Sequence, residues 1–359
     1  MDQTKTQVPT VISILSLTTH AGAIAGSDYN NVASCNDIIA RFQETDNTSH
    51  KDFIQRTVPW KRSRSLEMKK YFSPVFEDRL SSSEIHKTVA IIGSGPAAPT
   101  AHQLLGPTTI VWVINNAWRA VPKYDALIYS DDLPLERKPD AISLARLGRS
   151  SPQYYPAMVQ HGGILFCGAT MALAAGYMAI EAFPFSQIAF YASDMTYDSA
   201  PSHFYGEGSA DPLRHDISLQ DLDAKCLRLF YMGLERGCLV VNASSANISR
   251  LAIPHPKNSA FLRVNVMEDL KQPLINLLDT LRPLADAALK IEAQAEFDAG
   301  VYDYGRYMKE NAVWEYVRRV DAAWALMKPA VRNFSDLLTE TIKAKCEAPS
   351  LIRQPTETA

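Results

Sequence analysis

The sequence predicts an α/β fold in which helices cover a mostly parallel β-sheet, and three observations support this prediction. First, six short runs of β-branched and apolar residues recur between residues 88 and 242. Second, segments with helical periodicity lie between most of these runs. Third, the first run ends in the turn Gly93-Ser94-Gly95-Pro96, which is typical of a strand-to-helix connection in such folds.

The elements follow one another in a regular order. Strands are expected at residues 88–92, 109–114, 126–129, 164–166, 187–191 and 238–242. Helices are expected between them at residues 97–105, 169–182 and 219–237. The run 169–182 is too short to cross a bilayer and contains Glu181, so we expect a buried helix there. Two long helical patterns, 270–299 and 310–345, follow the last strand.

These patterns divide the chain into four parts. They are an N-terminal extension (1–87), a Rossmann-like nucleotide-binding catalytic domain (88–254), a helical region (255–347) and a disordered tail (348–359). Aromatic residues in the helical region are expected to serve packing or self-association. The C-terminal helices are therefore the predicted interface of a homo-oligomer.

Composition indicates a soluble globular protein. The 359 residues are 47% hydrophobic and 21% charged, and the formal net charge is −3, so there is no global basic field for nucleic acid. The five cysteines are widely spaced and form no CxxC pair, which indicates reduced thiols rather than disulfides or a zinc site. Neither a signal peptide nor a membrane span is expected. We therefore expect a cytoplasmic location, with peripheral association with the inner membrane as the alternative.

The glycine turn predicts a phosphate site, but not a classical dinucleotide enzyme. Glycines allow a tight turn whose backbone amides and following helix attract phosphate. A flavin or nicotinamide enzyme also needs an acidic residue at the end of the second strand to bind ribose hydroxyls. Here that strand is followed by Asn115 and Asn116. Amide side chains can read a ribose or a base without repelling phosphate, so a different nucleotide is favoured.

Polar residues also lie at the ends of the third and sixth strands. Asp131 and Asp132, after the third strand, either start a turn or approach a donor or metal. Asn242, at the end of the sixth, belongs to a helix-capping turn or contacts a nucleotide. Because ligands of parallel sheets bind beyond the carboxyl ends of the strands, these positions are candidate contacts.

The longest polar stretch follows the fifth strand and predicts a site. It begins with Asp194 and Tyr197 and continues through His203 to His215. A histidine can act as a base near neutral pH, and tyrosine hydroxyls can stabilise a leaving phosphate. Several such groups after one strand favour function over a structural role.

The order of these features resembles a known superfamily. A Gly-x-Gly-Pro turn is followed by an Asn-containing strand end, a glycine before an apolar helix, an Asp-x-x-Tyr strand end, a His-Tyr stretch and a strand ending in Asn-x-Ser. This order resembles the small bacterial sialyltransferases that use CMP-activated donors. It is also similar to the flagellin-modifying motility accessory factors and to archaeal-type hydroxymethylpterin diphosphokinases. The resemblance covers residues 89–253.

The resemblance implies roles for individual residues. It places Gly93, Ser94 and Gly95 at the donor phosphate and Asn115 or Asn116 at the nucleotide. Gly168, after Cys167, stands where the family has a Ser-Gly contact. Tyr197 and His203 fall near two tyrosines that stabilise the departing phosphate, and His215 falls where the family keeps its general base.

Three hypotheses follow. The first is a glycosyltransferase that moves a sialic-acid-like or other sugar from a nucleotide donor, CMP-linked if the resemblance holds, to a glycan, protein or other hydroxyl acceptor. It needs no metal and no cofactor other than the donor. The second is a pterin-type diphosphokinase whose Asp131, Asp132 and Asp194 bind Mg²⁺ around ATP. The third is a non-catalytic nucleotide-binding protein.

Overall fold

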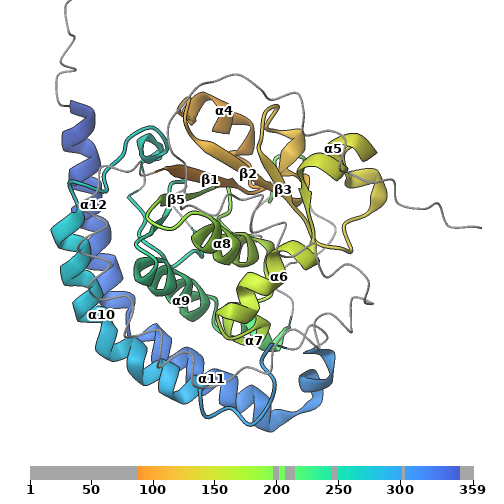
Figure 1. The fold of residues 1–359 in the computed structure, drawn as a ribbon, viewed down its shortest axis with the longest axis vertical. Helices are drawn as coiled ribbons and strands as arrows, with labels where there is room; N and C mark the ends of the chain where they lie inside the picture. Colours follow the sequence, from red (N-terminus) through yellow and green to blue (C-terminus); the bar gives the residue numbers. More distant parts are fainter. Residues whose placement is uncertain are drawn as a thin grey trace, which may run out of the picture.

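The computed structural model describes residues 87–196, 202–206, 215–244, 249–256, 258–300 and 304–347. Nearly all of the predicted N-terminal extension and the whole C-terminal tail lie outside these ranges. Within them the protein has an α/β fold of Rossmann-like type, as the sequence predicts (Figure 1).

The described residues contain a six-stranded sheet in which every strand pair is parallel. Its order is β4-β3-β2-β1-β5-β6. The strands are β1 (Thr88–Ile92), β2 (Ile110–Ile114), β3 (Ala126–Ile128), β4 (Gly148–Arg149), β5 (Gln187–Tyr191) and β6 (Leu239–Asn242). From β1 the chain builds β2, β3 and β4 on one side and then crosses to β5 and β6 on the other. The order therefore reverses between β1 and β5, which is where such sheets bind ligands.

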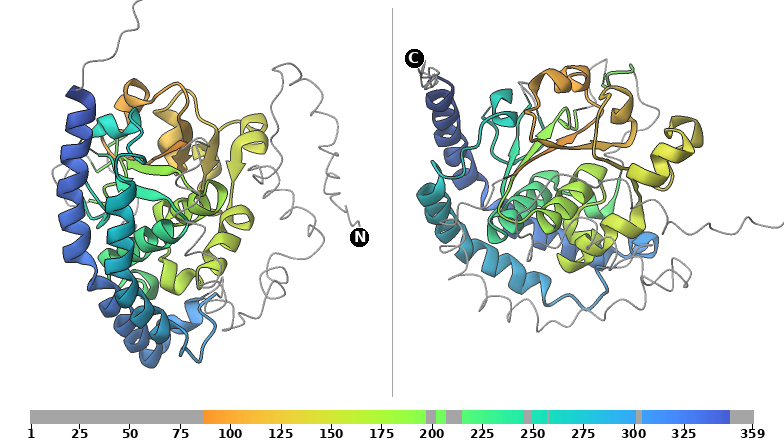
Figure 2. Two further views of the ribbon diagram at one scale, coloured as in Figure 1. Left: turned by 60° about the vertical axis from the view of Figure 1, so that its left-hand side comes forward. Right: turned by 45° about the horizontal axis from the view of Figure 1, so that its top comes forward.

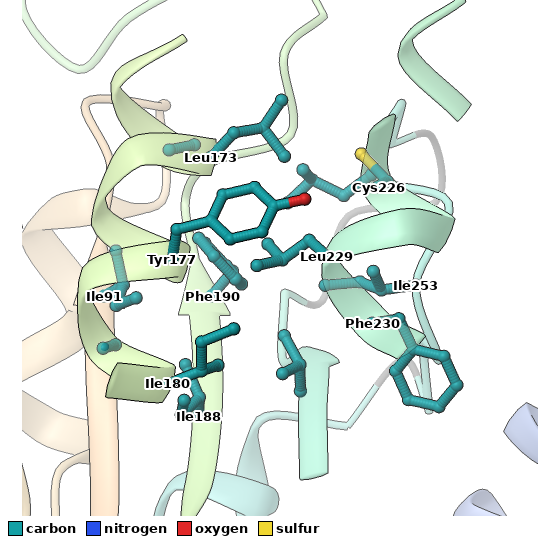
Figure 3. Packing of buried hydrophobic residues seen from close by; sticks show 14 of the residues in the cluster. Ile91, Leu173, Tyr177, Ile180, Ile188, Phe190, Cys226, Leu229, Phe230 and Ile253 are labelled. Carbon is teal, nitrogen blue, oxygen red and sulfur yellow. The ribbon is translucent and has the colours of Figure 1, made fainter. Parts of the chain in front are cut away.

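Helices cover both faces of this sheet. In Figure 1, α6 (Ser151–Gln160), α8 (Met171–Ala182) and α9 (Leu222–Glu235) lie on one side and α4 (Ala101–Leu104) on the other. Tyr177 projects from α8 toward Leu229 of α9, above Phe190 of β5 (Figure 3). All three side chains are buried, and burying a side chain of this size stabilises the fold by about 1.5–3 kcal/mol. Both strand faces are thus buried, in keeping with the apolar runs in the sequence.

The predicted strand at residues 164–166 is wrong. This segment is the short helix α7 (Ile164–Cys167), set between Gly163 and Gly168, which both have positive φ. An apolar run of four residues is too short to show a hydrophobic periodicity, so its sequence does not distinguish a strand from a buried helical turn. The strand that completes the sheet is instead β4, whose two residues, Gly148 and Arg149, carry no β-branched side chain.

Three predicted helices differ in extent. The helix expected at 97–105 is a 3₁₀ turn, η2 (Ala98–Thr100), followed by α4, and Pro99 lies in the first of them. The pattern 270–299 corresponds to α10 (Lys271–Glu292). The pattern 310–345 corresponds to two helices, α11 (Asn311–Ala325) and α12 (Lys328–Glu347), because the helix is interrupted at Leu326 and Met327.

The C-terminal helices form an outer layer along one side of the molecule (Figures 1 and 2). Two buried ion pairs join this layer to α9. Lys225 Nζ lies 2.6 Å from Asp321 Oδ1 in α11, and Arg228 binds Glu292 in α10 with Nε to Oε1 at 2.8 Å. Leu281 of α10 and Val317 of α11 are among the fully buried apolar residues of this layer. None of the helices in the described ranges has both the length and the apolar composition needed to span a bilayer.

Candidate functional site

The glycine turn at the end of β1 packs directly against the end of β5. Gly93 N donates to Tyr191 O at 2.8 Å, and Gly95 N donates to Ala192 O at 2.8 Å. A Cβ on Gly93 would lie 2.4 Å from both Ala192 O and Ser193 Oγ, so only glycine fits. The two amides therefore bond within the protein, and a phosphate here would meet other groups of the turn.

A short hairpin lies over the turn. His203 and Gly206 form an antiparallel bridge, and Phe204 N donates to Ser94 O at 3.1 Å. The Ser94 hydroxyl in turn donates to Ile114 O, at the end of β2, at 3.5 Å. Ser94 thus connects the hairpin at residues 202–206 to the ends of β1 and β2.

The two asparagines after β2 have different roles. Asn115 has a φ of 46° and accepts from Ser130 N at 3.1 Å, so it joins the ends of β2 and β3. Asn116 is only 5% exposed, and its Nδ2 donates to the Tyr205 hydroxyl at 3.2 Å. Its Oδ1 is buried and has no hydrogen-bond partner in the part of the chain that the structure describes. Such an acceptor is a place where a ligand group can donate.

His203 lies in the hairpin beside these groups. Its ring stacks on Tyr205 with centroids 4.9 Å apart, and its Nδ1 is 2.9 Å from the Ser202 hydroxyl. Burial, with the nearby Arg137 guanidinium, lowers the pKa of His203. Both causes favour the neutral form of the imidazole. Arg137 belongs to η4 (Leu135–Arg137), and its carbonyl accepts from Trp118 Nε1 at 3.0 Å.

Asp194 follows β5 on the other side of the turn. The side chain is 8% exposed, and its Oδ2 accepts from the Ser244 hydroxyl at 3.1 Å. Burial raises the pKa of this carboxyl. Its Oδ1 is a second buried oxygen that has no hydrogen-bond partner among the described residues.

The end of β6 is held by a polar turn. Asn242 Nδ2 donates to Ser249 Oγ at 2.8 Å, and its Oδ1 accepts from Ser244 N at 3.0 Å. Of the two interpretations of Asn242, this pattern supports a turn-forming role. The carbonyl of Ser244 then accepts from His255 Nε2 at 2.8 Å, which brings a further histidine to this edge.

Asp131 and Gly168 make structural contacts. The Asp131 carboxylate accepts from the hydroxyl of Ser151 and, at 3.4 Å, from its amide at the start of α6. Gly168 has a φ of 89°, and a Cβ there would lie 2.6 Å from Leu173 Cδ1, so this glycine permits the turn from α7 into α8. Asp131 and Asp194 are thus held by different elements. No group of three or more His, Cys, Asp or Glu side chains in the described ranges could hold a metal ion.

His215 contacts the helical region. Its ring stacks on Trp314 of α11, with centroids 4.5 Å apart and planes at 13°, and its side chain is exposed. Tyr197 lies outside the described residues. The roles predicted for both remain predictions.

Reasoning from sequence missed Arg137 and His255 as members of this edge. Arg137 lies well past β3, and His255 lies beyond the predicted end of the catalytic domain. Two other residues of this edge belong to motifs that the sequence does show: Tyr205 lies in the His-Tyr stretch, and Ser244 is the serine of the Asn-x-Ser strand end.

The fold and these groups define the class of protein: a Rossmann-like α/β protein with a polar site at the carboxyl edge of its sheet. The comparisons go no further, since no protein-family model, curated protein or solved structure matches the chain.

Proposed function

We propose that this protein is a glycosyltransferase that moves a sugar from a nucleotide donor to an acceptor hydroxyl. One observation carries the proposal: the buried oxygens Asn116 Oδ1 and Asp194 Oδ1, which have no partner among the described residues, follow β2 and β5, the two neighbours of β1. A buried acceptor without a donor costs about 1–3 kcal/mol. A ligand rich in hydroxyl and amino groups would remove this cost, and a nucleotide sugar is such a ligand.

The positions of the two oxygens favour one extended ligand. Ile92 of β1 is in register with Val113 and with Tyr191, and each oxygen belongs to the third residue beyond these partners. The glycine turn lies between them. A donor placed across the turn would present its base and ribose to one side and its sugar to the other, with the phosphate near Ser94 and His203.

The reaction would be a direct displacement. The acceptor oxygen forms a bond to the anomeric carbon, the bond from that carbon to the phosphate oxygen breaks, and the nucleotide leaves with that electron pair. His203 and Tyr197 would hydrogen-bond to the departing phosphate, and a histidine base would take the acceptor proton. Hydrogen bonds would carry the phosphate charge without a metal, as the resemblance to the sialyltransferases implies.

Ligand-dependent stability provides the first test. CMP, UDP, GDP and ATP, with the corresponding sugar nucleotides, would be added to the full chain while its melting temperature is recorded. A ligand at about one hundred times its Kd should stabilise the native state by about 2.7 kcal/mol. Transfer would then be followed with the donor that binds. No stabilisation and no turnover with any sugar nucleotide would reject the proposal.

EDTA separates this function from the diphosphokinase alternative. Transfer by the proposed route should continue in EDTA, whereas Mg²⁺-dependent transfer from ATP should stop. We also propose a cytoplasmic location and self-association through the C-terminal helices.

A further inference from the structure

His255 has one hydrogen bond that fixes its protonation pattern. Its Nε2 lies 2.8 Å from the carbonyl oxygen of Ser244. A carbonyl only accepts hydrogen bonds, so Nε2 carries the hydrogen. In the neutral ring, Nδ1 is then the bare nitrogen that can take up a proton. No hydrogen bond to Nδ1 exists within the described ranges, and the side chain is half-buried rather than enclosed.

The backbone around His255 is also held in place. His255 N donates to Ser335 Oγ in α12 at 3.2 Å, and Asn242 N donates to Pro254 O at 2.9 Å. Thr339 Oγ1 lies 3.5 Å from Pro256 O. The histidine is thus fixed between the end of β6 and α12, as a proton-transfer group requires.

A continuous set of contacts joins His255 to the glycine turn. Ser244, which accepts from His255, donates its hydroxyl to Asp194 at 3.1 Å. Asp194 follows Ser193, whose side chain lies against Gly93. Asp194 is also the carboxylate that interacts electrostatically with His255. The set therefore runs along the carboxyl edge from β6 through β5 to β1.

We propose that His255, through Nδ1, is the proton acceptor of the transfer reaction. The acceptor O–H bond breaks, its proton passes to Nδ1, and its electron pair forms the new bond to the anomeric carbon as the nucleotide leaves. This role rests on the proposed glycosyltransferase function. It differs from the expectation for His215, whose exposed ring stacks on Trp314 of α11.

The first experiment determines the tautomer of the His255 ring and needs no substrate. Long-range proton–nitrogen spectra of the full chain, labelled with ¹⁵N-histidine, would resolve the eight histidines, and the signal lost in H255Q identifies His255. We expect a hydrogen on Nε2 and a bare Nδ1 in the neutral ring. A hydrogen on Nδ1 in the neutral ring would overturn the proposal.

The second experiment uses His255→Gln with His102→Gln, at an exposed position of α4, as the matched control. The glutamine amide can still donate to Ser244 O but cannot take a proton at neutral pH. We expect H255Q to lower kcat/KM by roughly a hundredfold or more, with donor affinity retained, and to remove the acidic limb of the pH profile. We expect H102Q to keep the kcat/KM and the pH profile of the wild type.

The outcomes separate the two claims. Turnover and a pH profile in H255Q that match the wild type would reject His255 as the proton acceptor while leaving the glycosyltransferase assignment intact. A wild-type protein that transfers no sugar from any nucleotide would instead reject the proposed function, and the role of His255 with it.

Discussion

Arg228 of α9 donates two hydrogen bonds to Glu292 of α10, Nε to Oε1 and Nη2 to Oε2, each 2.8 Å long. The guanidinium is 1% exposed. Its Nη1 donates to the Tyr177 hydroxyl at 2.9 Å, and Trp324 Nε1 of α11 donates to Glu292 at 2.7 Å. One ion pair therefore connects the helices that cover the sheet to the outer helical layer.

Glu292→Gln should destabilise the whole protein. It leaves a fully buried guanidinium without its counter-charge, which typically costs about 3–5 kcal/mol. Urea unfolding would measure the loss. Glu315→Gln is the control, because Glu315 pairs with Arg318 on the surface and such pairs contribute about 0–1 kcal/mol. Equal losses in the two variants would contradict a central role for the Arg228 pair.

Gly93→Ala should separate β1 from β5. The added carbon would lie 2.4 Å from Ala192 O, so backbone must move, and overpacking of this kind costs about 1–3 kcal/mol. Gly106→Ala is the matched variant, since its carbon would come nearest to the Thr109 hydroxyl, at 3.3 Å, and would lie 3.8 Å from Leu262 O and 3.9 Å from Arg263 Cα. Chemical denaturation should show a clear loss for the first and little change for the second. If both unfold at the same urea concentration, the close approach is not essential.

Asn116→Ala should weaken nucleotide binding. It removes the unpaired Oδ1 and the bond to Tyr205. Tyr205→Phe removes only the bond, so we expect about fivefold weaker binding for Y205F and a larger loss for N116A. Calorimetric titration with the donor identified by thermal shift would measure both. Asn276→Ala, on the exposed face of α10, should bind like the wild type; equal affinity of N116A and N276A would remove Asn116 from the site.

Arg137→Gln should raise the pKa of His203. Burial is the larger cause of the lowered pKa of His203, and Arg137 adds to it, so the variant should move the pKa only part of the way toward the ordinary value. A nuclear magnetic resonance titration would follow the ring. Because the folded pKa of His203 is lowered, the stability linked to its neutral form is present above the unfolded pKa of about 6.5 and is lost as pH falls. Arg119→Gln, an exposed change, should leave the pKa of His203 unaltered.

Asp194→Asn should change how stability depends on pH. Burial raises the pKa of Asp194, so the stability linked to its protonated form is present below the unfolded pKa of about 3.9 and is lost as pH rises through the folded pKa. The asparagine does not titrate and can still accept from Ser244. The wild-type advantage over D194N in free energy of unfolding should therefore shrink from pH 4 to pH 7. Asp279→Asn, at an exposed position in α10, should show no such trend.

Sequence patterns predicted the sheet where strands are long and apolar. The predicted bounds of β1 and β5 agree with the structure, because five consecutive residues of each carry the signal of a strand covered on both faces. The two residues of β4 carry no such signal, and their pairing depends on β3. The apolar run of α7 predicts a strand but forms a helix, because its conformation depends on the glycines on either side of it and on tertiary packing.

The site was predictable only near strand ends. Asn116 and Asp194 could be named because each follows a strand of the expected sheet. His255 could not, since its place at this edge depends on a bond to Ser244 and on a contact with α12, eighty residues further along. Residues that come together only through tertiary packing have no characteristic spacing in the sequence, so no motif indicates their contact.

The hydrogen bonds from Gly93 and Gly95 to β5 have a consequence for ligand affinity. Many phosphate loops become ordered only when an anion binds their free amides, and the ordering weakens binding. This turn is fixed by its neighbouring strand before any ligand arrives, with donor distances of 2.8 Å. Ligand binding here therefore costs little backbone entropy. The rigid turn also restricts the orientations that a bound ligand can adopt.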